Sequence, residues 1–557
     1  MKVKYTYTRP VVGLHGVKTV RVKVLGYEIH QNETIATLDD NDTILIPHCR
    51  ADLKLTILIG LLRWRLGMKR FQVRAFLRAK GVSISKGAIS DRSLDFLLLF
   101  KALQKSRTGK IKSYFDRKGG VILHIDGTHK SGGKVVFVLQ EGFEDIIVDA
   151  GLIPNEASEF VEPILALFKE SYDSPLVVVR DMALGLELAV TNIFPDSKQQ
   201  ICQIHFIRDL EKDLVTMYHK GVKSSIIKHK LTPKLRSLRD YEGQFDKITG
   251  LEQRWIHIAV DYLLHPIVRH VKWISRPIAY YLHYRRVKEI SGYVRRLLRY
   301  NVSNNLYCKP LMELDTCLKS VLADPKVLES YRMLDKTLDW LEKLREELRI
   351  SRKDHLKAPP SEEIDIDLVK TKVDELLKTI RDEGDKLSGK YSGIAAHINA
   401  GFAAHWDELF VPDPIVNGKR IHFKRHNNSL ESSHRRTRKA IRERTGRSET
   451  KHEMEQFGDL LAIVSNLWNR TYLSEVLDDI DDLCSALSPF VKDLPQLRQE
   501  YRKVRRGPEV SIPDYKRLDI LDRFVEVLES SELVDALVSS LQSILGIDAE
   551  SAVICGV

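Results

Sequence analysis

Residues 121–130 read VILHIDGTHK, in which a run of aliphatic side chains leads into Asp126 and a glycine follows at once. Such a run predicts a buried strand that closes on a carboxylate. The stretch LVVVRD, residues 176–181, repeats the pattern and closes on Asp181. Open α/β sheets place their functional sites at the carboxyl ends of strands. If the two strands are neighbours, we expect both carboxylates to project into one cleft.

The sequence around these two strands alternates between strand and helix patterns. Further strands are predicted at 133–140, 145–153 and 198–206, and helices at 155–172, 183–194 and 207–221. Strands that alternate with helices after an initial β-meander predict an α/β layered sheet.

The composition favours a folded protein with a polyanionic partner. Hydrophobic residues are 43% and charged residues 29% of the 557 residues, and no apolar run is long enough to span a membrane. The N-terminal MKVKYTYTRP lacks the apolar segment of a secretory signal. Six scattered cysteines without a C-x-x-C pair argue against a zinc ribbon or a disulfide framework. The net charge of +12 points to nucleic acid first.

The N-terminal third offers a candidate DNA-reading element. Residues 1–50 are predicted to form short strands, including a β-rich run at 43–49, and residues 52–104 to form helices. Gly81 separates the last two of these helices, and Ser83 and Ser85 are placed to cap the third. Helix, glycine-containing turn and helix is the helix-turn-helix pattern, although a plain helical hairpin has the same signature. An outward major-groove face would be formed by Lys86, Ser90, Asp91 and Arg92.

Residues 222–420 are strongly helical in pattern and contain no convincing strand. Apolar residues keep helical spacing on both sides of KAPPSE, residues 357–362, which predicts two antiparallel helices joined at Pro359-Pro360. The two stripes consist of Leu334, Leu338, Leu341 and Leu348, and of Ile366, Val369, Val373, Leu376 and Ile380. We interpret them as packing surfaces rather than as partner-binding faces.

A third acid follows this helical stretch, in NNSLESSHRRTRKAIRERTG at 427–446. Asn427, Asn428 and Ser429 are good N-cap types, so Glu431 falls in the first turn of a helix. A glutamate there is often only a partner of the helix dipole. Many positive charges follow Glu431 on the same predicted helix. Like charges at this density destabilise an isolated helix, but a phosphate backbone would neutralise them. These charges are Arg435, Arg436, Arg438, Lys439, Arg442, Arg444 and Arg447.

A second basic stretch lies at 280–300, reading YYLHYRRVKEISGYVRRLLRY. Aromatic side chains beside cations can grip unpaired or distorted DNA, whereas a solvated amphipathic helix is the plain alternative. The aromatic residues are Tyr280, Tyr281, Tyr284, Tyr293 and Tyr300, and the cations are Arg285, Arg286, Lys288, Arg295, Arg296 and Arg299.

Asp126 and Asp181 would repel each other in one cleft unless a cation lay between them. Hard carboxylate oxygens suit Mg2+ or Mn2+. The residues alone therefore predict a metal-dependent phosphodiesterase that acts on nucleic acid.

Five features in this order resemble a known family: IDGTH at 125–129, VVRD at 178–181, CQIH at 202–205, a helical insertion, and NNSLE at 427–431. The chain is similar over residues 119–470 to the DDE transposases of insertion sequences, in particular the Mutator/MULE-like group of the RNase H-like superfamily. Many relatives carry a zinc-binding N-terminal domain, for which this chain has no cysteine pair. We therefore expect the helices at 52–104 to recognise the element ends.

The resemblance implies a site and a reaction. Asp126 would lie on the first strand of an RNase H-like sheet, Asp181 after the fourth strand and Glu431 on a late helix. Two ions, Mg2+ or Mn2+, would be held, with Asp126 bridging both and Asp181 and Glu431 holding one each. Water would first free a 3′-OH at the transposon end, and this 3′-OH would then attack target DNA without a covalent enzyme intermediate.

The pair Cys202 and His205 matches a Cys-x-x-His motif of related groups. Two ligands cannot close a zinc site. A buried Cys202 on a strand and a His205 packed at a helix start form the simpler interpretation. A contact between His205 and the scissile DNA strand is the functional alternative.

The predicted architecture is an α/β RNase H-like core that is interrupted by a large all-α insertion. The segments are a β-rich 1–50, a helix-turn-helix-like DNA-binding domain at 51–115, core parts at 119–221 and 421–470, the insertion at 222–420 and a helical region at 471–557. The expected partners are double-stranded terminal inverted repeats and target DNA, with at least a homodimer on DNA and no membrane. The location would be the cytoplasm of a prokaryote or the nucleus of a eukaryote. A silent transposase-derived DNA-binding protein and another RNase H-like nuclease, such as a resolvase, remain alternatives.

Overall fold

The computed structural model describes residues 2–14, 16–26, 35–38, 44–47, 49–129, 133–240, 251–268, 272–273, 276–300, 305–350, 365–445, 449–478 and 482–506. Contacts divide the chain into two units, Met1–Pro495 and Gln496–Val557. Helix α20 (Leu494–Arg506) contains all the described residues of the second unit, so the fold below is that of the first unit.

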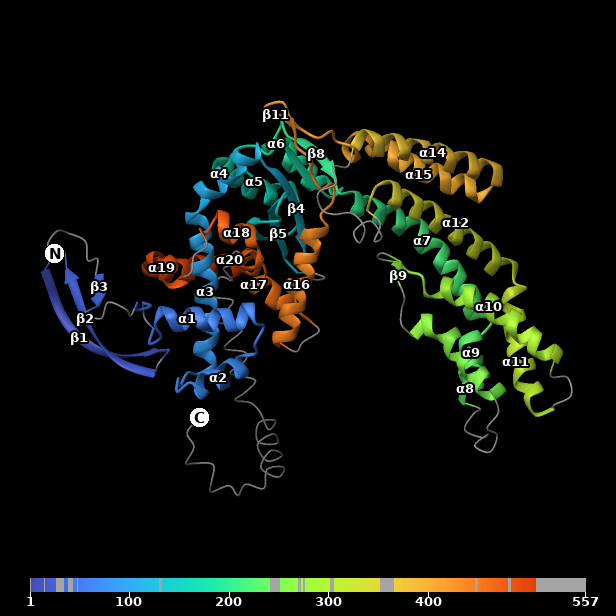
Figure 1. Ribbon diagram of the computed structural model, residues 1–557, viewed down its shortest axis with the longest axis horizontal. Coiled ribbons are helices and arrows are strands. Elements are labelled where there is room, and N and C mark those ends of the chain that lie inside the picture. The colour runs from blue at the N-terminus through green and yellow to red at the C-terminus, as the bar shows by residue number, and fades with distance from the viewer. Residues whose placement is uncertain are drawn as a thin grey trace, which may run out of the picture. The chain divides into compact units, whose positions relative to one another are not determined.

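A five-stranded mixed sheet forms the centre of the first unit (Figure 1). Its strands are β4 (Ile122–Thr128), β5 (Val135–Glu141), β6 (Ile147–Ile153), β7 (Val177–Arg180) and β8 (Lys198–Ile201). The strand order is β6-β5-β4-β7-β8, in which β5 is antiparallel to β4 and β6, while β7 is parallel to β4 and β8. The predicted α/β layered sheet with an initial meander is therefore confirmed.

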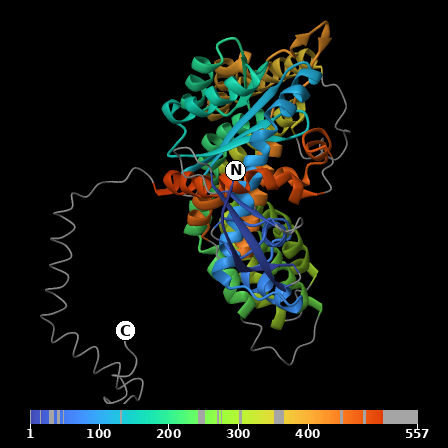
Figure 2. The same cartoon turned by 90° about the vertical axis from the view of Figure 1, so that its left-hand side faces the viewer.

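Helices cover both faces of this sheet, which can be followed in Figures 1 and 2. On one face, a Cβ added to Gly151 of β6 would lie 3.0 Å from Ile164 of α5 (Ser158–Tyr172). On the other face, Gly458 of α17 (Lys451–Val464) packs against Val136 of β5. Val136 pairs with Leu152, the neighbour of Gly151, and successive side chains of a strand point to opposite faces. The sheet is thus buried on both sides.

Helix α6 (Leu184–Ile193) packs beside α5, and α3 (Lys86–Ser106) packs beside α17. The amide of Gln104 on α3 donates to the carbonyls of Ile147 and Val148 at 3.0 and 2.8 Å. A helix of the predicted DNA-reading segment therefore also belongs to the core around the sheet.

The N-terminal strands are longer than the short strands that the sequence predicts. β1 (Lys2–Gly13) and β2 (Gly16–Gly26) form an antiparallel pair, to which β3 (Ile35–Leu38) adds a third strand. The β-rich run predicted at 43–49 forms only a single bridge, from Leu45 to Asp52, in its described part. Pro47, two residues after Leu45, has no backbone N–H with which to continue a ladder.

The helices predicted at 52–104 are confirmed. α1 (Leu53–Gly60) continues as a short π-helical stretch, Leu61–Arg65, and is followed by α2 (Arg70–Ala79) and α3. Gly81 has a φ of 76°, a left-handed conformation that glycine adopts without strain. Ser85 caps α3 by accepting a hydrogen bond from the backbone N–H of Ala88 at 3.1 Å. A further helix, α4 (Thr108–Lys118), leads into the sheet.

The outward orientation predicted for Arg92 is wrong. Its guanidinium pairs with Asp95 at 2.8 Å, and both side chains are buried. Arg92 lies on a buried stretch of α3 with Ser93 and Asp95, and the carboxylate three residues further along the helix offsets its charge there. Lys86 at the start of α3 is exposed, as predicted.

The strand predicted at 198–206 is too long by its second half. β8 ends at Ile201, and α7 (Gln203–Lys228) begins with Cys202 as its N-cap. Phe206, Ile207 and Leu210 are buried at helical spacing, which places QIHF on the first turn of α7. α7 also runs past residue 221, where the sequence predicted the first core part to end.

Helices dominate the described residues between α7 and residue 420. They are α8 (Leu231–Asp240), α9 (Leu251–Val268), α10 (Ala279–Tyr300), α11 (Asn305–Leu322), α12 (Pro325–Glu347), α14 (Ile366–Leu387) and α15 (Lys390–Leu409). In the described part of this stretch, strands occur only as two-residue pairs: β9 (Lys272–Trp273) with β10 (Arg276–Pro277), and β11 (Ile415–Val416) with β12 (Lys419–Arg420).

The two predicted apolar stripes are buried on α12, with its C-cap Leu348, and on α14, and these two helices pack against each other. One position differs, because Leu377 rather than Leu376 is buried on α14. The proposed joint at Pro359-Pro360 lies outside the described residues. Both stripes belong to one core that also contains Ile201 and Phe206, so these helices are continuous with the end of the sheet.

The chain returns to the sheet through α16 (Asn428–Thr445) and α17, followed by the short helices α18 (Arg470–Glu475) and α19 (Leu483–Leu487). None of the helices in the described residues combines the length and apolar character needed to cross a membrane.

Candidate active site

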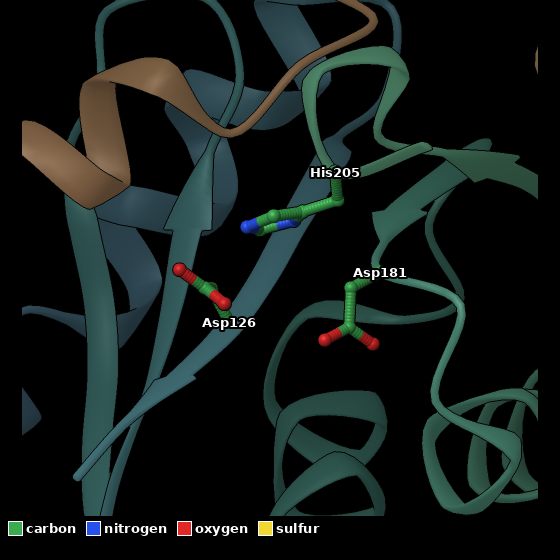
Figure 3. A group of neighbouring side chains, drawn as sticks. All are labelled: Asp126, Asp181 and His205. Atoms are coloured by element: carbon green, nitrogen blue, oxygen red, sulfur yellow. The ribbon is translucent and has the colours of Figure 1, made fainter. Parts of the chain in front are cut away.

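Asp126 and Asp181 lie side by side because β4 and β7 are parallel neighbours. His124 is level with Val179 in the register, and the two aspartates follow these residues by the same two positions. Ligand atoms of Asp126, Asp181 and His205 all lie within 4.8 Å of one another. Figure 3 shows the three side chains gathered in one space. One detail of the prediction changes: Asp126 does not close its strand, since β4 continues to Thr128.

Asp181 is fixed at the start of the turn that follows β7. Its Oδ1 accepts a hydrogen bond from the backbone N–H of Ala183 at 2.8 Å, and burial raises the pKa of the carboxyl. The preceding Arg180 is fully buried and pairs with Glu408 on α15 at 2.7 Å. The ion pair between Arg180 and Glu408 therefore holds the segment that carries Asp181 in place.

His205 stands on the first turn of α7 between two carboxylates. Its Nε2 lies 3.0 Å from Oε1 of Glu431. Burial alone would lower the pKa of His205, but hydrogen bonds with Cys202 and Glu431 and the charge of Asp126 raise it to about 11. This shift favours the protonated ring, whose Nε2 donates to Glu431. It supplies positive charge within the acidic group.

His205 connects Glu431 to the two aspartates. Arg208, one turn further along α7, forms a two-pronged ion pair with Glu431, in which Nη2 donates to Oε2 at 2.8 Å. Burial would raise the pKa of Glu431, but the hydrogen bonds from His205 and Arg208 lower it to about 2. The predicted third ligand is thus present but engaged by two cations. Arg208 was not predicted; its only signal is its place three residues after His205.

A buried asparagine sets the position of the Glu431 helix. Asn427 directly precedes α16 and is fully buried. Its backbone N–H donates to Sγ of Cys202 at 3.2 Å, its side-chain amide donates to the carbonyl of Ile125 at 2.9 Å, and its Oδ1 lies 2.9 Å from Nδ1 of His124. Cys202 is therefore a buried hydrogen-bonding group at the N-cap of α7 and not on a strand as predicted.

Two further side chains at the site were missed by the sequence analysis. His434 on α16 is buried, and its Nε2 lies 3.5 Å from Oδ2 of Asp126. Glu156, in the loop between β6 and α5, has its pKa raised to about 7 by burial and by the charges of Asp181 and Asp126. His434 lies three residues after Glu431 and so shares its helix face, whereas the loop around Glu156 carries no recognisable pattern.

The chemistry of this group fits a hard divalent cation. Four carboxylates, those of Asp126, Asp181, Glu156 and Glu431, are matched by two cations, His205 and Arg208. Oxygen donors of this kind are the ligands that Mg2+ and Mn2+ prefer. The unsatisfied Nε2 of His434 also points at Asp126 from within the protein. Asp126 and Asp181 are the residues best placed to hold such an ion.

Residues 138–233 match the family model described as Transposase, Mutator family. This part of the chain is similar to Mutator-family transposases. This confirms the resemblance seen in the sequence and supports a transposase function. The segment includes Asp181, Cys202 and His205 but ends before α16. A search of the curated proteins found no match.

The basic residues that follow Glu431 fall into two groups. Arg435, Arg436, Lys439 and Arg442 are exposed, and Arg438 is half-buried. Arg444 is buried instead, with its guanidinium 4.1 Å from the ring centroid of Trp64 on the π-helical stretch. Arg447 lies outside the described residues. The exposed face of α16 is therefore basic, whereas Arg444 near the end of the helix packs against Trp64.

The basic and aromatic residues of α10 also divide into buried and exposed side chains. Tyr281 and Tyr284 are buried, and Tyr281 stacks on Tyr331 with ring centroids 5.3 Å apart. The prediction that these two rings can stack on DNA bases is wrong, because they pack against α12. The cations Arg285, Lys288, Arg295, Arg296 and Arg299 are exposed, whereas Arg286 is half-buried. Arg286 lies over the ring of Tyr262 at 4.0 Å.

Proposed function

We propose that this chain is a DNA transposase that cleaves phosphodiester bonds at transposon ends and transfers the resulting 3′-OH into target DNA. The observation that carries the proposal is the pairing of β4 with β7, which brings Asp126 and Asp181 together with His205. The strand order, with the first acid on the central strand and the second after the fourth, fits an RNase H-like core. The segment match to Mutator transposases supports the same reading.

Asp126, Asp181 and Glu431 are the proposed catalytic acids and the proposed ligands of two divalent ions, Mg2+ or Mn2+. Bound ions of this kind activate the attacking oxygen and stabilise the leaving oxygen of an in-line displacement at phosphorus. The protein side chains hold the ions and position the scissile phosphate, and no Ser or Tyr nucleophile is needed. Glu431 takes this role when Arg208 and His205 release its carboxylate.

Arg208 and His205 have a natural second partner in the DNA. The planar guanidinium that grips both oxygens of Glu431 matches a phosphate equally well. His205 carries a positive charge beside Asp126 and can donate to a phosphate oxygen. We propose that the scissile strand draws these two cations from Glu431, which then faces the aspartates.

The exposed cations offer sites for the rest of the DNA. On α16 they include Arg435, Arg436 and Arg442, on α10 they include Arg285, Arg295 and Arg296, and on α3 there is Lys86. Such side chains neutralise phosphates and make binding depend on salt. Because transposition holds two element ends together, we propose that the active form on DNA is a homodimer or larger.

Nicking of supercoiled plasmid by the purified chain tests the proposal, with Mg2+, Mn2+ or EDTA and with Asp126→Asn, Asp181→Asn and Glu431→Gln beside the native protein. Metal-dependent nicking that is lost in all three variants is expected. Nicking that survives in the variants would refute the acid assignment.

The choice of DNA substrate separates the remaining alternatives. Preference for a terminal inverted repeat over a branched junction is expected of a transposase, and the reverse preference would identify a resolvase. DNA binding without nicking of cognate ends would identify a silent, transposase-derived binding protein.

A further inference from the structure

We infer that Glu156 is a further metal-ligating carboxylate of this site, acting beside Asp126 and Asp181 on a bound divalent cation. This inference rests on the proposed function and extends it, because the family resemblance assigns only three acids. Glu156 comes from a different part of the chain, the loop between β6 and α5.

The backbone is shaped to admit the carboxylate of Glu156. A Cβ added to Gly127, the residue directly after Asp126, would collide with Oε1 of Glu156 and lie 3.0 Å from its Cδ. The Glu156 carboxylate, together with the Val135 side chain, therefore occupies the space that a side chain at position 127 would fill. Any larger residue after Asp126 would displace it. This gives the glycine of the IDGTH motif a physical role.

A second glycine fixes the main chain at the same place. A Cβ added to Gly185, in the first turn of α6, would collide with the carbonyl oxygen of Glu156 and lie 3.0 Å from Cα of Ala157. Gly185 is four residues after Asp181. The loop that carries Glu156 thus packs closely against the residues that follow each aspartate. This packing restricts the conformations of the Glu156 side chain.

Glu156 has no structural duty that would explain it otherwise. The N-cap of α5 is Ala157, whose backbone N–H is satisfied by Oδ1 of Asn155 at 2.8 Å, and the acid in the first turn is Glu159. Within the described residues, no side chain or backbone group donates a hydrogen bond or ion pair to the Glu156 carboxylate. A half-buried carboxylate next to two others is unfavourable without a compensating charge. A divalent cation provides that charge.

An independent polar group, from helix α16, lies beside Asp126. The His434 side chain is 7% exposed, its Nε2 makes no hydrogen bond, and this atom lies 3.5 Å from Oδ2 of Asp126. A buried ring nitrogen left without a hydrogen-bond partner beside a carboxylate is costly unless a further group satisfies the site. Asp126, Asp181 and His205 share one location, which Figure 3 shows, while His434 lies beside Asp126 and Glu156 lies beside Gly127, the next residue.

The test is binding of Mn2+ alone to the full chain, measured by the loss of the free-ion electron paramagnetic resonance signal and by calorimetry. Glu156→Gln keeps the shape of the side chain and removes its charge. Its apparent Kd for Mn2+ is expected to rise by about tenfold or more. The matched control is Glu159→Gln, an exposed acid three residues further on in the first turn of α5, which is expected to bind Mn2+ as the native chain does.

Thermal unfolding separates loss of a ligand from loss of the fold. In EDTA, Glu156→Gln is expected to unfold at the native temperature or above it, because one of several crowded negative charges is gone. The rise in Tm that Mn2+ gives the native chain is expected to be reduced. A lower Tm in EDTA together with native Mn2+ affinity would assign Glu156 a structural role and overturn the inference.

Two further variants keep the test decisive. Glu156→Asp restores the charge one methylene further away and is expected to recover part of the Mn2+ affinity. Asp126→Asn is expected to lose Mn2+ binding whatever the role of Glu156. If Asp126→Asn loses binding and Glu156→Gln does not, the inference fails and the proposed function stands. If Asp126→Asn also binds Mn2+ normally, the proposed function itself fails.

Discussion

The side-chain amide of Asn427 donates a 2.9 Å hydrogen bond to the carbonyl of Ile125, the residue before Asp126. The same asparagine accepts the backbone N–H of Glu431 through its own carbonyl at 2.9 Å. One buried residue therefore connects the strand of the first acid to the helix of the third. Its contact with Cys202 adds the helix that carries His205. The spacing of the candidate catalytic groups depends on this junction.

Replacing Asn427 by alanine is expected to destabilise the protein and to weaken nicking. The change leaves the Ile125 carbonyl and Nδ1 of His124 without their partner in a fully buried place, which costs about 1–3 kcal/mol for each group. Urea unfolding and plasmid nicking measure the two effects. The neighbouring Asn428 is half-buried, so Asn428→Ala is the matched control, with an expected change within about 0.5 kcal/mol. Equal effects of both substitutions would disprove the special role of Asn427.

Two histidines near the site have pKa values that are shifted in opposite directions from the usual histidine value. The pKa of His205 is raised to about 11, while burial lowers the pKa of His124 to about 4. Histidine-selective NMR labelling at pH 7.5 is expected to report a protonated ring at His205 and a neutral ring at His124. A His205 signal that titrates between pH 6 and 7 would contradict the charge balance described above.

The stability that His205 contributes follows from the sign of this shift. Its pKa rises from 6.5 in the unfolded chain to about 11, so the contribution is fully present below pH 6.5 and is lost as the pH rises toward 11. The difference in unfolding free energy between native protein and His205→Gln is therefore expected to be largest near pH 6 and to shrink by pH 10. A difference that grows with pH would refute the protonated assignment.

The ion pair between Arg208 and Glu431 gives the opposite dependence on pH. The pKa of Glu431 falls from 4.5 to about 2, so its contribution is present above pH 4.5 and is lost as the pH falls toward 2. Arg208→Gln is expected to cost about 1–2 kcal/mol at pH 7, since both partners are partly exposed, and to match the native protein below pH 2. Lys212→Gln, on the exposed side of α7, is the control and is expected to change stability little.

The sequence carried enough information for the strands and their acids, but less for the groups between them. The aliphatic runs before Asp126 and Asp181 predict buried strands, because an uninterrupted apolar run has few other uses. Whether β4 and β7 are neighbours depends on long-range pairing, which no local pattern contains. Arg208, His434 and Glu156 lie on helices or in a loop and reach the site only through that pairing. The outward orientation predicted for Arg92 was wrong for a local reason, because its partner Asp95 lies one turn away on the same helix.

The helix that carries Glu431 ends with two arginines that look alike in sequence and differ in the structure. Arg442 is exposed, whereas Arg444 is buried against Trp64. Arg444→Ala is expected to lower the free energy of unfolding by about 2 kcal/mol, because a desolvated cation–π contact is lost. Arg442→Ala is expected to leave Tm unchanged and to reduce the slope of log affinity against log salt by about one for DNA binding. Thermal unfolding measures the effect on stability. Fluorescence anisotropy of DNA binding at about 50–200 mM salt measures the effect on the salt slope. If Arg442→Ala left the salt slope as it was while lowering Tm, the exposed face of α16 would be a packing surface and not a DNA-binding one.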